Sequence, residues 1–538
     1  MNLKRFAALW FLLVAVTVFA VPSTNLKSLC VMIDGVRADA LAAANTPNLD
    51  KLRDGTWAKG YHCAWSDVCG NVEDARPDSA PNHVALATGV TAAKHQVFTN
   101  DQVAEGDYKD YPSYLSRLKK KEGQDFKAVF LYNWKEDGKI SSPGVVSKQG
   151  TDAQSTERAV KELSNGADAM FIMLDDPDHA GHDKGFYAFS KDYIKAIEAA
   201  DAQVGRMLDA IKSRPDFNKE DWLVAVTADH GGYHRDHGMW GGCASTIPLL
   251  ISGKHVSQGL IQGQPHNYDA PATVLSHYGL VSSDVDGKIV GDKVVDVKPV
   301  RLDKDLQYYL PFKNFFTNEA GDKKVIVHGE NIVTGKKGAK FRNYYEVNTR
   351  HQKSYLTLAG SDKLKLPEDN QFTITMWLNM PLMEMDSPVI LANKDITKKN
   401  EPGFVLYAAH KVDRAKRPGI AAEFLSKDGK PVILGQFDIP VDYWTFFAIT
   451  VDTNGMMRLY QGAPDGRFYW ISTNAKGAKI NSGKPWHIFQ DASEKCCNQF
   501  EGKMEDFAFW NRSLSQKEIK SIFDAGMKNK PLDSLFSN

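Results

Sequence analysis

The chain has 538 residues, too many for one typical hydrophobic core, so we expect two domains. Hydrophobic residues make up 43% of the chain and charged residues 25%, which is the balance of an ordinary folded protein. Lys plus Arg and Asp plus Glu each total 66, so the formal net charge is zero. This balance gives no signal for a nucleic acid or an anionic membrane as a partner.

The N-terminus has the layout of a secretory signal peptide. Lys4 and Arg5 precede an apolar run from Phe6 to Ala20, which ends in a small-residue cleavage pattern. The run is short for a membrane span. We therefore expect residues 1–20 to be a signal peptide and the mature protein to be secreted, periplasmic or at the cell surface, with an uncleaved anchor as the alternative. No later segment is apolar enough to cross a bilayer, so no transmembrane span is expected after cleavage.

The six cysteines would then lie in an oxidising compartment. Cys63 and Cys69 lie close together in an irregular-looking segment and could close a small loop. Cys30 and Cys243 fall beside apolar strands and are expected to be core thiols. The adjacent Cys496 and Cys497 have no partner that the sequence can assign. No CxxC pair exists, so a cysteine zinc site has no support.

In residues 26 to 290, short apolar runs alternate with amphipathic stretches. Continuous apolar runs of this kind are typical of parallel strands that are covered on both faces. Apolar residues recur at helical spacing from Ile194 to Ile211, which predicts a covering helix. The alternation predicts an α/β domain with a mostly parallel sheet flanked by helices. The expected strands are 29–33, 169–174, 222–226 and 247–251.

The pattern changes after about residue 300. Aromatic or alternating stretches such as Phe372–Trp377 and Trp444–Ile449 replace the helical periodicity. Turn signals such as Thr453-Asn454-Gly455 separate them. Many short strands with such turns predict an all-β sandwich as the second domain.

Potential metal ligands follow the expected strands of the first domain. In open α/β sheets, ligands bind beyond the carboxyl ends of the strands, so these side chains should converge on one rim. Carboxylates and imidazoles suit zinc and other borderline divalent metals, and two such ions, with zinc as the expected metal, are predicted. A helical turn would point Asp178 and His182 the same way, and adjacent residues in a loop can serve two different ions. The predicted ligands are Asp34, Asp178, His182, Asp229, His230 and His237.

A nucleophile candidate lies in Asp78-Ser79-Ala80-Pro81-Asn82-His83. An apolar stretch up to Thr88-Gly89 follows, so Ser79 is expected at a helix N-terminus, where free backbone N–H groups attract phosphate. A bordering metal would lower the pKa of the Ser79 hydroxyl. Asn82 could donate a hydrogen bond to the oxygen on which transition-state charge grows. Singly, each residue could be a helix cap or a surface pair, but their joint occurrence at strand exits argues for a catalytic site.

On these motifs the sequence resembles the alkaline phosphatase superfamily, most closely its type I phosphodiesterase/nucleotide pyrophosphatase branch. The resemblance covers about residues 26 to 290. The segments that carry it are Asp34-Gly35-Val36-Arg37, Thr46-Pro47-Asn48-Leu49, Ser79-Ala80-Pro81-Asn82-His83, Asp178-His179-Ala180-Gly181-His182 and Thr227-Ala228-Asp229-His230-Gly231-Gly232.

The resemblance implies a secreted hydrolase that cleaves phosphate mono- or diesters through a phosphoserine. One metal would be held by Asp34, Ser79, Asp229 and His230, and the other by Asp178, His182 and a third histidine. For that histidine His237 is favoured over His266. The branch usually carries threonine where this chain has Ser79, which weakens any inference of a diester preference. Substrate specificity would come from loops such as residues 56 to 78 and 95 to 110.

The second domain resembles a laminin G-like jelly roll of the concanavalin A type. The stretches that carry this resemblance include Tyr308–Phe312 and Gly502–Arg512, followed by a short closing helix from Ser515. The expected bounds are 21–300 for the hydrolase domain and 305–530 for the jelly roll. Trp377, Trp444 and Trp510 are expected to pack in the core. The resemblance implies either glycan binding or a structural role for this domain.

Two alternatives to the phosphate-ester hydrolase stay open. A sulfatase shares the fold, and Ser79 and Pro81 fit its maturation pattern, but His83 stands where that pattern has arginine. The other alternative is a glycan-binding or adhesion protein whose hydrolase domain is inactive. The apparently complete set of ligands argues against it.

Overall fold

A computed structural model provides the structure of the chain. The expected signal peptide lies outside the described residues, as do Cys496, Cys497 and the side chain of Cys243. The structure describes residues 25–140, 142–188, 190–238, 242–295, 301–313, 316–329, 332–335, 339–341, 344–347, 354–364, 366, 370–380, 388–409, 419–437, 439, 442–464, 466–493, 500 and 502–536.

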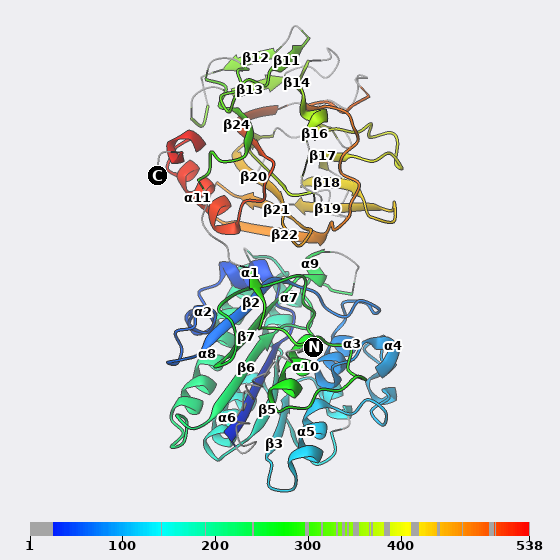
Figure 1. Ribbon diagram of the computed structural model, residues 1–538, viewed down its shortest axis with the longest axis vertical. Coiled ribbons are helices and arrows are strands. Elements are labelled where there is room, and N and C mark those ends of the chain that lie inside the picture. Colours follow the sequence, from blue (N-terminus) through cyan, green and yellow to red (C-terminus); the bar gives the residue numbers. More distant parts are fainter. Residues whose placement is uncertain are drawn as a thin grey trace, which may run out of the picture.

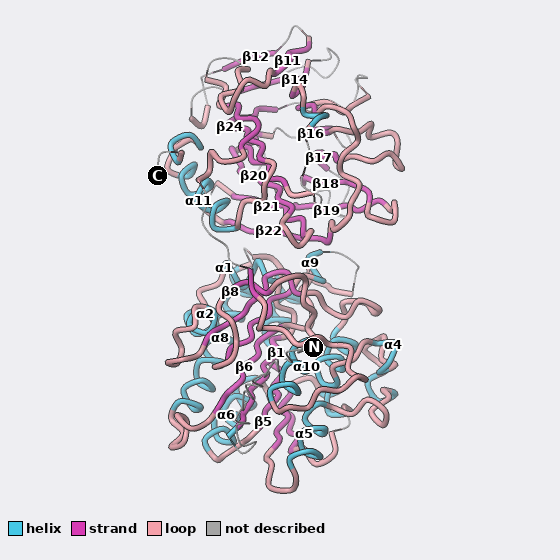
Figure 2. The backbone as a smooth tube through the Cα atoms, viewed as in Figure 1, coloured by secondary structure: helices cyan, strands magenta, loops and turns pink. Residues whose placement is uncertain are grey.

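The chain forms two lobes stacked along the long axis of the molecule (Figure 1). The lower lobe combines helices with a central sheet, whereas strands dominate the upper lobe and a helix lies against its side (Figure 2). Each lobe has its own large hydrophobic core. The predicted fold class, an α/β domain followed by an all-β sandwich, is confirmed.

The first domain contains a nine-stranded sheet in the order β4-β3-β5-β1-β6-β7-β2-β8-β9. Parallel pairs join β4 to β3, β3 to β5, β5 to β1 and β1 to β6. Strand β7 runs antiparallel to both β6 and β2, so the expectation that this apolar run forms a parallel strand is wrong. Full burial makes parallel and antiparallel strands look alike in sequence. The strands are β1 (Leu26–Ile33), β2 (His62–Cys69), β3 (Ala128–Tyr132), β4 (Val146–Gln149), β5 (Ala169–Leu174), β6 (Asp221–Thr227), β7 (Ile247–Gly253), β8 (Gly259–Ile261) and β9 (Val294–Val295).

Helices flank this sheet. The predicted covering helix is α8, and its apolar residues from Ile197 to Ile211 are buried in the core of the domain, as expected. The α-helices of the first domain are α1 (Ala38–Ala43), α2 (Pro47–Arg53), α3 (Ser79–Thr88), α4 (Ala92–His95), α5 (Tyr114–Glu122), α6 (Asp152–Ser164), α7 (Asp176–Lys184), α8 (Lys191–Lys212), α9 (Gly242–Ser245) and α10 (Asp269–His277). Two short 3-10 turns are η2 (Val103–Glu105) and η3 (Lys135–Lys139).

The segment around Cys63 and Cys69 is not irregular, because both residues belong to strand β2. Both thiols are free and buried. Six residues of extended strand span about 20 Å, far beyond the Cα separation that a disulfide tolerates, so the predicted small loop is wrong. The same strand occupies part of the range 56 to 78, which was expected to be a specificity loop. Cys30 is a free, buried core thiol, as predicted.

The second domain is a sandwich of two antiparallel sheets. One has the order β12-β13-β24-β15-β20-β21-β22, with β10 also paired to β24, and the other has the order β11-β14-β23-β16-β17-β18-β19. The strands are β10 (Leu306–Leu310), β11 (Val325–His328), β12 (Ile332–Gly335), β13 (Tyr344–Val347), β14 (Tyr355–Leu358), β15 (Phe372–Asn379), β16 (Val389–Ala392), β17 (Phe404–Ala409), β18 (Gly419–Leu425), β19 (Pro431–Phe437), β20 (Trp444–Val451), β21 (Met456–Gly462), β22 (Phe468–Asn474), β23 (Trp486–Ile488) and β24 (Gly502–Trp510).

The closing helix of this domain is α11 (Gln516–Met527). Ser515 caps it, and the side chain of Glu518 bonds back to the backbone of Ser515 in a capping box. Trp377 and Trp510 are buried in the cluster between the sheet and this helix, and Trp444 packs against it. The prediction that these tryptophans serve the core is confirmed. Among the described residues, no helix combines the length and the apolarity that crossing a membrane requires.

Candidate functional site

The predicted ligands lie at one rim of the first sheet, where parallel strands end. Asp34 directly follows β1, Asp178 lies in the first turn of α7 after β5, and Asp229 and His230 follow β6. Gly35 makes the approach of β1 to α7 possible. It has φ +71°, and a Cβ at this position would lie 2.8 Å from the Cα of Asp178.

A first group joins Asp34, Asp229 and His230, whose ligand atoms all lie within 4.8 Å of one another. His230 Nε2 is 3.2 Å from an oxygen of Asp229 and 3.5 Å from an oxygen of Asp34. Ser79 Oγ lies 3.1 Å from the same nitrogen. The nucleophile candidate and three predicted ligands therefore come together from three separate segments.

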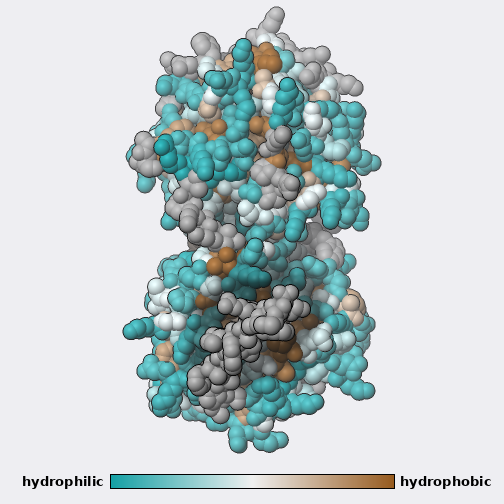
Figure 3. Space-filling view, in the orientation of Figure 1, coloured by the Kyte–Doolittle hydropathy of each residue, from teal (hydrophilic) through white to brown (hydrophobic). Residues whose placement is uncertain are grey.

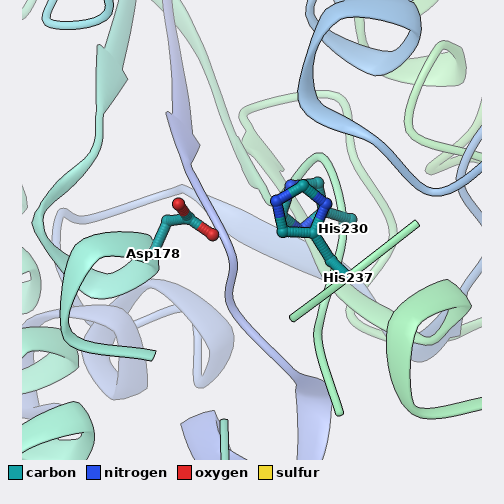
Figure 4. A group of neighbouring side chains, drawn as sticks. All are labelled: Asp178, His230 and His237. Carbon is teal, nitrogen blue, oxygen red and sulfur yellow. The ribbon is translucent and has the colours of Figure 1, made fainter. Parts of the chain in front are cut away.

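A second group joins Asp178, His230 and His237 (Figure 4). The rings of His230 and His237 stack with centroids 3.9 Å apart, and the carboxylate of Asp178 points toward them. His182 Nε2 is 3.4 Å from Asp178 Oδ2, and its ring centroid is 5.0 Å from that of His237. All the predicted metal-site side chains are therefore at one place, and His230 belongs to both groups.

The hydrogen bonds of two histidines fix which ring nitrogen faces the site. The Nδ1–H of His230 donates to the carbonyl of Gly231 at 2.7 Å, and the Nδ1–H of His182 donates to the carbonyl of Arg235 at 2.8 Å. In each ring Nδ1 is occupied as a donor, so Nε2 is the nitrogen that lies next to the carboxylates of the site. Metal-binding histidines are typically oriented in this way by a partner on the other nitrogen.

His266 does not join either group among the described residues. Its Nε2 lies 2.7 Å from a carboxylate oxygen of Glu73, and its ring stacks on Tyr268. His237 lies between Asp78, at 3.4 Å, and the ring of His230. The geometry therefore favours His237 as the third histidine.

Asp175 lies at the site although the sequence reasoning did not select it. Its carboxylate forms a third group with those of Asp34 and Asp178. The residue directly follows β5, which is the same signal that selected Asp34 after β1. Its side chain also pairs with the exposed His179 at 3.3 Å.

Ser79 is the first residue of helix α3, as predicted. Its side chain is largely buried, and Gly89 ends the helix in the left-handed conformation. The N–H of Ala80 donates to Oδ1 of Asn100 at 2.9 Å, which brings that side-chain amide next to the nucleophile candidate. Asn100 is partly exposed and was missed, since nothing in the sequence connects it to Ser79.

Asn82 is in a different environment from the one predicted. It is completely buried, its oxygen accepts hydrogen bonds from Val72 N and Asn267 Nδ2, and its own amide donates to the carbonyl of Asp78 at 2.9 Å. These bonds tie Asn82 to three backbone and side-chain partners around the start of α3. This geometry favours a structural role for Asn82 and leaves Asn100 better placed to donate to a bound oxygen.

His83 forms a buried hydrogen-bonded cluster with three carboxylates. Its Nδ1 is 2.8 Å from Asp137, and its Nε2 is 3.1 Å from both Asp34 and Asp229. Both His83 and Asp137 are only 1% exposed. His83 lies one helical turn after Ser79, so the sequence alone could have placed it near the nucleophile candidate. It could not have placed Asp137 there, because Asp137 comes from the distant turn η3.

Burial and neighbouring charges set the protonation of these groups. Burial lowers the pKa of His230 to about 3, although the Asp229 carboxylate opposes this shift, so its imidazole is neutral at physiological pH. Burial raises the pKa of Asp178 to about 6 against the opposing effect of His237 and His182. Burial also raises the pKa of Asp34 well above its usual value, and the charges of Asp229 and Asp178 add to this shift.

The pKa of His83 moves in the opposite direction from that of His230. Burial alone lowers it, but the carboxylates of Asp137, Asp229 and Asp34 raise the pKa of His83 well above its usual value. His83 is therefore an imidazolium that donates from both nitrogens. It offsets part of the negative charge that the site would otherwise bury.

The site residues fit divalent metal ions. Oδ1 of Asp34 and Oδ1 of Asp178 are buried and have no hydrogen-bond partner among the described residues. A buried carboxylate oxygen without a partner is costly, and a cation would satisfy both oxygens. The neutral imidazole of His230 and these carboxylates also match the ligand types that borderline metals prefer.

Comparisons with known proteins agree with this description. Residues 32–280 match the model of the Metalloenzyme superfamily, and residues 350–520 match that of the concanavalin A-like lectin/glucanases superfamily. No curated protein sequence matches. The first domain is therefore an alkaline phosphatase-like metalloenzyme domain, which implies that it binds divalent metal, and the second is a laminin G-type, concanavalin A-like domain. The predicted resemblances to the alkaline phosphatase superfamily and to a laminin G-like, concanavalin A-type domain are confirmed.

Several solved structures are distantly similar. Murine ectonucleotide pyrophosphatase/phosphodiesterase 5, an inactive variant in complex with AMP, is 14% identical, with 49% of this chain and 98% of that chain covered and a TM-score of 0.38. A 2-O GAG sulfatase is 14% identical, with coverages of 62% and 82% and a TM-score of 0.37. The receptor-binding domain of botulinum neurotoxin type G is 15% identical, with coverages of 41% and 51% and a TM-score of 0.31. Similarities this low carry no information about activity.

Proposed function

We propose that this chain is a secreted, metal-dependent hydrolase of phosphate esters in which Ser79 is the nucleophile. The observation that carries the proposal is the position of Ser79. Its hydroxyl is 3.1 Å from His230 Nε2, at the first residue of α3 and beside the group formed by Asp34, Asp229 and His230. A serine in this place has both a metal site and a helix N-terminus within reach.

In this proposal Asp34, Ser79, Asp229 and His230 hold one ion, and Asp178, His182 and His237 hold the other. Zinc is the proposed metal, because the ligands are imidazoles and carboxylates without a thiolate. When bound, two such ions lower the pKa of the serine hydroxyl and stabilise charge on the attacking and leaving oxygens. The proposal follows from the donor set and from the two carboxylate oxygens that lack partners.

Ser79 Oγ forms a bond to phosphorus and releases its proton to water, the bond from phosphorus to the ester oxygen breaks, and that oxygen takes a proton from water and leaves as the alcohol, so a phosphoserine forms. Water then attacks phosphorus, the bond to Ser79 Oγ breaks, and a proton from the attacking water restores the Ser79 hydroxyl. A monoester substrate yields phosphate, and a diester substrate yields a phosphate monoester. Asn100 lies beside the N–H of Ala80 and is the proposed donor to a phosphoryl oxygen. His83 and Asp137 keep Asp34 and Asp229 oriented throughout.

The structure bears on the sulfatase alternative through His83. A sulfatase maturation pattern needs arginine at this position, where this chain has an imidazolium enclosed by three carboxylates. We therefore place sulfate-ester hydrolysis second.

Purified protein loaded with zinc tests the proposal on nitrophenyl phosphate, bis-nitrophenyl phosphate and nitrophenyl sulfate at equal concentrations. We expect turnover of at least one phosphate ester to exceed that of the sulfate by 100-fold or more, on the order of 3 kcal/mol in transition-state stabilisation. A faster rate on the sulfate would reverse the assignment. Fewer than one bound metal ion per chain and no turnover would indicate an inactive hydrolase domain.

A further inference from the structure

The two domains meet through specific contacts from one edge of the jelly roll. Strand β22 contacts helix α1 and helix α9 of the first domain. Figure 1 shows both helices at the end of the lower lobe that faces β22, and Figure 3 shows that the molecule narrows at this level. The side chain of Tyr469, on β22, is only 4% exposed and belongs to the hydrophobic core of the first domain.

Polar contacts reinforce this edge. Arg458 Nη2 donates to Asp67 of strand β2 at 2.9 Å, and its Nη1 donates to Asp452 of its own domain at 2.7 Å. Ser472 Oγ is 2.9 Å from Thr246 Oγ1 in the first domain. Asp67 lies where the pairing of β2 with β7 changes register, and such irregularities redirect side chains. The domain contact thus has a buried apolar residue and a paired charge, as stable interfaces do.

The two helices that the jelly roll contacts are joined to metal-site residues by short backbone or by a hydrogen bond. Helix α1 begins four residues after Asp34, and the N–H of Ala38 at its start bonds to the carbonyl of Thr246. The carbonyl of Ala244 in α9 accepts a hydrogen bond from the N–H of Gly231, the residue after His230, at 2.8 Å. Strand β22 therefore packs on a helix that follows Asp34 and on a helix that is hydrogen-bonded to the residue after His230.

These helices need external support. Helix α1 has six residues and α9 has four, and isolated helices shorter than about 12 residues are marginal in water. Their stability must come from tertiary packing, to which β22 contributes. A small shift of α1 would be transmitted to Asp34 along the short backbone segment between them, and a shift of α9 would be transmitted to His230 through the hydrogen bond between Ala244 and Gly231.

We propose that the jelly-roll domain is a fixed part of the catalytic unit, in which Arg458 and Tyr469 act as positioning residues for the metal site through α1, α9 and β2. The domain is then not a detachable binding module. The effect on turnover rests on the proposed hydrolase function, whereas the effects on metal affinity and on domain coupling do not.

A charge-reversal series in the full-length chain tests this proposal. Arg458→Asp places a third carboxylate beside Asp67 and Asp452, and Asp67→Arg places two cations together. We expect each single variant to bind zinc at least tenfold more weakly in chelator competition, and to turn over nitrophenyl phosphate at least tenfold more slowly. The double variant, with the charges exchanged, should recover both values to within about threefold of wild type.

Two further variants separate positioning from general damage. Arg512→Glu breaks an Arg–Glu pair inside the jelly roll that does not reach the first domain, and it should change zinc affinity less than twofold. Tyr469→Ala should weaken zinc binding as the charge reversals do, while Tyr469→Phe retains most of it. Wild-type zinc affinity in both single reversals would overturn the proposal, and so would a double variant that stays as impaired as the singles.

If a single charge-reversal variant fails to fold, the double variant still tests the proposal. Recovery of folding and zinc binding in the double variant would support the proposal, and no recovery would overturn it. If wild-type protein hydrolyses no phosphate ester, the zinc affinities and a single cooperative unfolding transition for both domains still test the inference independently of the substrate.

Discussion

The buried cluster around His83 allows a quantitative prediction for the variant His83→Gln. In the native chain one imidazolium faces three carboxylates, at 2.8 Å from Asp137 and 3.1 Å from Asp34 and Asp229. Glutamine retains an amide donor but no charge, so Asp137 would be left buried without a cation. Removal of one partner from a buried ion pair costs about 3–5 kcal/mol.

This loss should appear as a large decrease in thermal stability of the metal-free protein. At about 2–4 °C per kcal/mol for a domain of this size, the midpoint of the first domain is expected to fall by about 6–20 °C. Bound metal should recover part of the loss, because a cation compensates Asp34 and Asp229 but not Asp137. Calorimetry with and without zinc measures both effects.

A double-mutant cycle identifies the cause. The variant Asp137→Asn removes the other charge, so His83→Gln combined with Asp137→Asn should be more stable than the sum of the two losses predicts, by about 1–3 kcal/mol. Glu136→Gln, at a half-buried neighbour of Asp137 that pairs with Lys139, is the matched control and should change stability by less than about 0.5 kcal/mol. Strictly additive losses would refute the reasoning that the charge pair stabilises the site.

Three further predictions concern the site. Ser79→Ala should reduce turnover at least about a thousandfold while metal content stays near wild type. Asp229→Ala should lower both the metal content and the rate, because a ligand is lost; metal analysis and rate assays measure the two effects. Burial raises the pKa of Asp178 to about 6, so in the metal-free protein this group makes stability fall as pH rises from about 4 to 6. Zinc binds the ionised carboxylate of Asp178. The rise in the midpoint temperature of unfolding on adding zinc should therefore be larger at pH 7.5 than at pH 5. Asn100→Ala should lower kcat by about 10²- to 10³-fold with little change in KM, and equal losses in a binding-only assay would contradict its role as a transition-state donor.

The sequence by itself determined the elements of the first domain and the kinds of residues at its rim. Strands β1, β5 and β6 and helix α8 are where the apolar periodicity places them, because periodicity reflects burial of one local segment. The sequence also predicted the types of metal ligand, since an Asp or a His directly after a strand must lie at the carboxyl edge of the sheet. The second domain was recognisable from its aromatic strands and turns for the same local reason.

Only the tertiary structure decided which of these residues touch. The antiparallel direction of β7, the strand that contains Cys63 and Cys69, and the pairing of His83 with Asp137 all depend on segments far apart in the chain. The same is true of Asn100 beside Ala80. Local sequence patterns cannot encode such contacts, because a hydrogen bond forms within about 3 Å and its partner arrives through the packing of a different element.

The relation between the domains was decided in the same way. Nothing in the spacing of residues predicts that Tyr469 enters the core of the first domain or that Arg458 meets Asp67. These contacts join residues almost 400 positions apart, and they exist only because one edge of the jelly roll fits two short helices at the rim of the sheet. The sequence therefore specifies the chemistry of the site, and packing specifies its geometry.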